Sequence, residues 1–134
     1  MENNKALKTQ GIAMIIFLAI QYVLGMTVNL FSNFPKTISA GKLWEYAWSQ
    51  FYIAGHIVIG ILLLIGAIVF VIRSVIAKDV KWIIFSVVGL LAIIIAGSSG
   101  AIFITAQTDI YSYVMSLGFI VAVASYFIGI IYSK

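Results

Sequence analysis

Four long apolar stretches, separated by short polar segments, make up almost the whole chain. Each contains about 20 or more mostly apolar residues, the length that a helix needs to cross the hydrocarbon core of a bilayer. The pattern predicts a single domain, residues 1–134, with an outer loop at 32–49. The predicted spans are residues 11–31, 51–74, 82–105 and 111–132.

The second stretch carries the only histidine of the chain, His56. At about 100° per residue, Gly55, Gly60 and Gly66 share with it an arc of about 140°. The opposite side is nearly all Ile, Val and Leu. Branched aliphatic side chains can face lipid, whereas small residues let a neighbouring helix approach closely. We therefore expect His56 to point into the protein.

The other three stretches also have one small or polar side each. In the first, Gln21 lies near the middle of the span, where an amide without a partner costs several kcal/mol, so it should face inward and be hydrogen-bonded. Its stripe also holds Gly11, Met14, Gly25, Asn29 and Ser32. The third stretch has Ala92, Ala96, Ser99 and Gly100, and the fourth has Met115, Gly118, Ala122, Ser125 and Gly129.

Charged residues between the stretches predict the orientation. Six cations fall on one side, namely Lys5, Lys8, Arg73, Lys78, Lys81 and Lys134, against Lys36 and Lys42 on the other. Cytoplasmic loops carry the excess of Lys and Arg, so both termini should be cytoplasmic. Short turns favour neighbouring helices of opposite direction. The predicted fold is an all-α, multi-pass protein of the cell membrane, an antiparallel up-and-down bundle of four transmembrane helices.

The outer loop is rich in aromatic residues. Trp44, Tyr46 and Trp48 are typical of the aromatic belt at a membrane surface. Residues 43–49 are predicted to form a short helix lying in that interface.

Composition narrows the function. With 63% hydrophobic and 9% charged residues, a soluble domain is excluded. The absence of cysteine excludes disulfides and thiolate metal sites. No basic surface with interleaved aromatics supports nucleic-acid binding. All four acidic residues lie outside the predicted hydrocarbon, and no complete catalytic set is present. The predicted partners are the bilayer and either a second copy or a larger membrane complex.

One hypothesis assigns haem b to the bundle. His56 lies roughly 9 Å from the outer surface, at about 1.5 Å per residue, and Met115 lies at similar depth. Both residue types are axial ligands of haem iron, and Ser99 and Gly100 would leave room for a flat macrocycle. In the alternative, His56 is neutral and bonded to a hydroxyl or amide on a neighbouring helix. The architecture resembles the four-helix b-type cytochromes, which commonly supply histidines in pairs; no site residue is transferred from them, since this chain has one histidine.

Other functions remain open beside the haem hypothesis. A quinone or lipid headgroup could bind through His56, Gln21 and Asn29. A small transporter is disfavoured, because only Gln21 and Ser125 bring polarity near the bilayer centre. The first hypothesis is a non-catalytic accessory or structural subunit.

The segment Gly25-Met26-Thr27-Val28-Asn29-Leu30-Phe31, followed by Pro35 and then by His56 with Gly60, resembles the opening half of a group of small prokaryotic four-helix integral membrane proteins. These have no assigned activity. The resemblance covers about the first two spans and implies a fold without implying a function.

Overall fold

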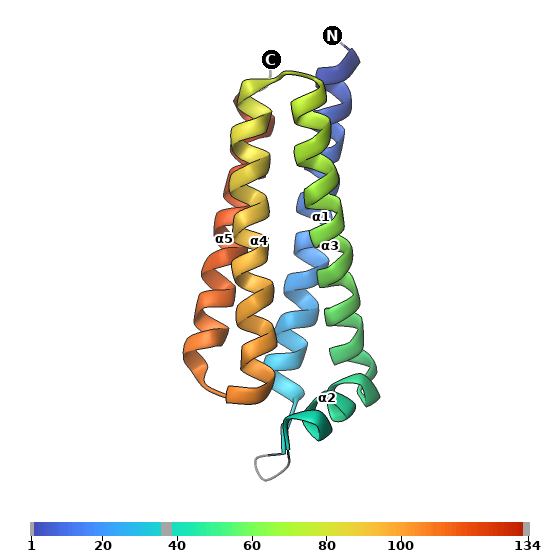
Figure 1. Cartoon of the computed structure of the whole chain (residues 1–134), viewed down its shortest axis with the longest axis vertical. Coiled ribbons are helices and arrows are strands. Elements are labelled where there is room, and N and C mark those ends of the chain that lie inside the picture. Colours follow the sequence, from blue (N-terminus) through green and yellow to red (C-terminus); the bar gives the residue numbers. More distant parts are fainter. Residues whose placement is uncertain (1, 36–38, 133–134) are drawn as a thin grey trace.

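The computed structural model of the chain describes residues 2–35 and 39–132, which form five α-helices (Figure 1). Their bounds are α1 (Glu2–Phe31), α2 (Ala40–Ser49), α3 (Phe51–Ile76), α4 (Val80–Ala106) and α5 (Asp109–Tyr132). Among these, α1, α3, α4 and α5 are long and apolar enough to cross a membrane. Lys36 and Lys134, which entered the charge count, lie outside the described residues.

The first helix begins earlier than the apolar pattern predicted, at Glu2 instead of residue 11. The added turns are polar, but they are held by the rest of the molecule: Leu7 is buried, and Trp82 Nε1 donates a hydrogen bond to Asn4 Oδ1 at 3.2 Å. The short helix of the outer loop exists and starts a few residues earlier than expected, at Ala40. Tertiary contacts thus lengthen elements whose own residues give a weak signal.

The long helices lie side by side, with α1 against α3 and α5, and α4 against the same two helices. Lys81 Nζ donates to Tyr132 O at 3.3 Å, and Arg73 Nη1 donates to Gln10 Oε1 at 2.7 Å. These two contacts, with the Trp82–Asn4 bond, gather the first turns of α1 and α4 and the last turns of α3 and α5 at one end (Figure 1).

Three aromatic rings fill the core near that end. Phe70, Trp82 and Tyr126 are fully buried, and the Phe70 ring centroid lies 5.2 Å from that of Trp82 and 5.5 Å from that of Tyr126. Glycines make room for two of them: a Cβ atom on Gly129 would lie 2.6 Å from the Trp82 ring, and one on Gly89 would lie 2.5 Å from the Tyr126 ring. The close packing of α4 and α5 depends on these glycines.

At the other end, α2 packs across the bundle against α3 and α4. Leu43 and Ala47 of α2 form a second apolar cluster with Ile53 and Ile104. Through α2, this segment is therefore packed onto α3 and α4.

Candidate functional site

Gln21 on α1 and His56 on α3 form a polar pair that links two spanning helices. Gln21 Nε2 donates to the backbone oxygen of His56 at 3.0 Å and lies 3.4 Å from the ring nitrogen His56 Nε2. Both residues are partly buried. The expectations that Gln21 is hydrogen-bonded inward and that His56 points into protein are confirmed.

Each of these side chains rests on a glycine of the opposite helix. A Cβ atom on Gly25 would lie 3.0 Å from His56 Cε1, and one on Gly60 would lie 3.1 Å from Gln21 Nε2. In both helices the glycine follows the polar residue by four positions. Residues i and i+4 lie on the same face of a helix, one turn apart. The two helices therefore present the same motif to each other: a polar side chain and, one turn later, a glycine that receives the partner's side chain.

The same helix pair continues toward the aromatic core. Gly66 faces Met14, whose Sδ would lie 3.1 Å from an added Cβ, and Gln10 Nε2 donates to Gly66 O at 3.5 Å. Gly55 was predicted to lie against a neighbouring helix. Instead, no described atom of a neighbour lies within 4 Å of the place that a Cβ atom on Gly55 would take. Two of the three glycines on the His56 arc therefore serve helix contact, and the third does not.

Two buried polar atoms at the pair, Gln21 Oε1 and His56 Nδ1, have no hydrogen-bond partner within the described part of the chain. When Gln21 donates to Nε2, that nitrogen is the acceptor and Nδ1 carries the ring proton. The pair then offers one unused acceptor and one unused donor. This is the chemistry that a small polar ligand would find there.

Met115, the second predicted haem ligand, lies on α5 against α4. Its Sδ would lie 3.2 Å from a Cβ atom on Gly100, and the neighbouring Ser99 is buried. The structure thus joins His56 with Gln21 and Met115 with Gly100, in two different helix pairs. The haem assignment to His56 and Met115 stays a prediction.

Asn29 differs from the predicted inward stripe and is exposed. It lies in the last turn of α1, near the end of the span, where an amide can be satisfied by interfacial water and need not be buried. Ser99 and Gly100 do lie on an inward seam, but with Met115 instead of with the Gln21–His56 pair.

Within residues 2–35 and 39–132, no group of three His, Cys, Asp or Glu side chains is arranged to hold a metal ion. The contact between Gln10 and Arg73, which links α1 to α3 at the end of the bundle, was not predicted from the sequence. The repeated four-residue spacing, Gln21 to Gly25 and His56 to Gly60, is the signal that could have predicted the central contact.

Comparisons with protein-family models, with curated proteins and with solved structures found no match to this chain. Function is therefore inferred from the contacts of the chain alone.

Proposed function

We propose that this protein is a non-catalytic accessory or structural subunit of the cell membrane. In this proposal it is an antiparallel up-and-down bundle with both termini cytoplasmic, and it acts by binding a membrane protein partner or a second copy of itself. The observation that supports the proposal most is the mutual engagement of Gln21 and His56, each seated on a glycine of the opposite helix.

Some polar side chains of the spans connect one helix to another. Besides the Gln21–His56 pair, Ser125 Oγ donates to Phe85 O at 2.7 Å and joins α5 to α4. Arg73 joins α3 to Gln10 of α1. Interhelical hydrogen bonds of this kind add stability and specify which faces meet. A scaffold held in this way suits a protein whose surface, instead of an internal reaction centre, performs the function.

The outer end offers the surface for a partner. There α2 presents Trp48, which is 51% exposed, and the adjoining first residue of α3, Phe51, is 86% exposed. Exposed aromatic residues are enriched in protein interfaces as well as in the aromatic belt at a membrane surface that the sequence predicted for Trp48. We assign the partner contact to this end.

Site-specific photo-crosslinking in native membranes tests the proposal. A photoreactive residue at Trp48 should give a discrete adduct heavier than the 14.7 kDa chain, whereas the same residue at Ala47, which is fully buried, should give none. Catalytic turnover or solute flux by the purified chain alone would refute a non-catalytic role. Equal adducts from both positions would refute the assigned surface.

A second candidate is a ligand-binding bundle, favoured by the unpartnered atoms Gln21 Oε1 and His56 Nδ1. These two atoms suit the polar atoms of a quinone or lipid headgroup. In the haem alternative, with His56 and Met115 as ligands, His56 would have to offer the iron a ring nitrogen without a proton, and Gln21 would have to give up its contact with Nε2. The visible absorption spectrum separates these outcomes. Protein expressed with ample haem should show a Soret band that His56→Leu abolishes if haem binds, and no Soret band and no uptake on titration would end the haem candidate.

A further inference from the structure

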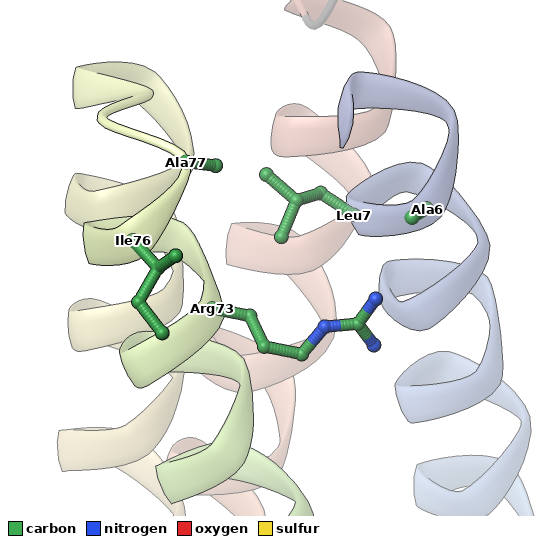
Figure 2. A pocket seen from close by; sticks show the side chains of 5 residues that line it. All are labelled: Ala6, Leu7, Arg73, Ile76 and Ala77. Atoms are coloured by element: carbon green, nitrogen blue, oxygen red, sulfur yellow. The ribbon is translucent and has the colours of Figure 1, made fainter. Parts of the chain in front are cut away.

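A small hollow opens between α1 and α3 at the end that holds the first turn of α1. Ala6 and Leu7 line it from α1, and Arg73, Ile76 and Ala77 line it from the α3 side (Figure 2). Its volume is about 120 Å³, well below the ~300 Å³ of the smallest common cofactor pockets. The hollow fits a headgroup or part of a chain, not a whole cofactor.

The lining combines an apolar wall with one cation. Figure 2 shows the Arg73 side chain reaching from α3 toward α1 below Leu7. Arg73 Nη1 donates to Gln10 Oε1 at 2.7 Å, and a guanidinium group has five N–H donors in a planar fork. The remaining donors suit the paired oxygens of a phosphate, which arginine binds in bidentate fashion.

A second hollow of about 450 Å³ adjoins the first and shares Ala77 with it. Lys78 and Lys81 stand on its rim. The carboxylate of Asp79, also on this rim, accepts a hydrogen bond from Trp82 N, and this contact caps α4. Cations therefore dominate the surroundings of both hollows, and they would repel the choline group of a zwitterionic lipid.

Both hollows lie where the α3 span ends at Ile76. The phosphate of a leaflet lipid lies at this boundary between hydrocarbon and water, and basic pockets between transmembrane helices bind anionic headgroups. We propose that an anionic phospholipid binds here, with its phosphodiester on Arg73 and its headgroup toward Lys78 and Lys81, so that its acyl chains extend from Arg73 toward the bilayer centre. This inference is independent of the accessory-subunit proposal.

Native mass spectrometry of the purified full chain tests the site. The protein is titrated with phosphatidylglycerol and with phosphatidylcholine of the same acyl chains. Phosphatidylglycerol should bind more tightly, and Arg73→Gln should weaken it about fivefold, the effect of one cation near a lipid surface. Lys42→Gln, the same charge change in α2 at the other end, should leave its affinity unchanged.

Two further arms separate the alternatives. Gln10→Ala removes the neutral partner of Arg73 and keeps the charge, so it should retain the preference for phosphatidylglycerol; a loss as large as that of Arg73→Gln would show a structural effect and overturn the proposal. Inorganic phosphate should not displace the lipid. Displacement by phosphate would assign the site to a free anion, and equal binding of both lipids would refute headgroup recognition.

Discussion

At the scale of single residues, Gln21 and His56 satisfy part of each other's polarity in a region with little water. The amide of Gln21 reaches the backbone oxygen of His56 because Gly60, one turn further along α3, has no side chain in its way. The ring of His56 in turn lies on Gly25. Each polar group depends on a glycine of the other helix, so the four positions should act as one unit.

A double-mutant cycle measures this dependence. Gln21→Leu and His56→Leu should each leave the protein folded, because interhelical hydrogen bonds in membranes average about 0.6 kcal/mol. The double variant should lose less unfolding free energy than the two single variants lose in total. The difference, which is the coupling energy of the pair, should be about 0.6 kcal/mol. Denaturant unfolding in micelles gives the free energies.

Gln21→Leu combined with Met115→Leu is the control, since Met115 packs on Gly100 in the other helix pair. Its effects should add. Additive effects in the Gln21–His56 cycle would contradict the mutual support of these two residues.

At the scale of helices, small residues set how closely α4 and α5 approach. A Cβ atom on Gly118 would lie 2.8 Å from the backbone oxygen of Ala92 and 3.0 Å from the Cβ atom of Ala96. Those atoms belong to a helix backbone and to a methyl group fixed on it, so they cannot turn aside. The predicted seam of Ala92 and Ala96 is confirmed by this contact.

Gly118→Ala should therefore lower the free energy of unfolding by about 1–3 kcal/mol, the usual cost of overpacking. Gly97→Ala makes the same chemical change on α4, where no neighbouring atom among the described residues lies within 4 Å. That control should be neutral or stabilising by up to about 1 kcal/mol, because alanine favours helix more than glycine does. Equal destabilisation by both would refute the seam.

The short helix α2 should respond to alkaline pH through Tyr46. Partial burial raises the pKa of the Tyr46 hydroxyl above its ordinary value, and the nearby Tyr52 raises it further. A group whose pKa is raised on folding stabilises the protein below its unfolded pKa, and this stability is lost as pH rises through the folded value. Thermal unfolding should therefore occur at lower temperature near pH 11 than near pH 8, and less so in Tyr46→Phe. Tyr113 is largely exposed. If Tyr113→Phe reduced the alkaline loss of thermal stability as much as Tyr46→Phe does, a specific role of Tyr46 would be contradicted.

At the scale of the whole molecule, charge separates the two ends of the bundle. Arg73, Lys78 and Lys81 belong to the end where α1 begins, together with Lys5 and Lys8, against two acidic residues, Glu2 and Asp79. The end covered by α2 carries Lys42, Glu45 and Asp109 among the described residues. This asymmetry favours a cytoplasmic position for the basic end.

The natural absence of cysteine makes this orientation testable by single-cysteine labelling. In intact cells a membrane-impermeant maleimide should label Glu45→Cys in α2. Lys78→Cys, in the turn between α3 and α4, should react only after the cells are opened. The reverse pattern would contradict the proposed orientation, and labelling of both in intact cells would contradict the number of crossings between them.

The hydrophobic pattern identified the spans, and the helical spacing of small and polar residues identified the side of each span that faces protein. Gln21, His56 and Gly118 are examples from three of the spans. Counting residues from the span ends placed Met115 and Gly100 at similar depth, but it did not predict that Gln21 would be hydrogen-bonded to His56. Trp82 and Tyr126 also escaped prediction: aromatic residues near span ends resemble belt residues, and only the glycines of the opposite helix, Gly129 and Gly89, give them a buried place.

Enclosure of the single imidazole between α1 and α3 is tested most directly by NMR in lipid nanodiscs. With histidine and valine labelled and a spin label on the lipid acyl chains, the ring signals of His56 should keep most of their intensity. The methyl signals of Val58, two residues further along α3 and 45% exposed, should be strongly broadened. Equal broadening of the His56 ring and the Val58 methyls would place the ring in lipid and contradict the account.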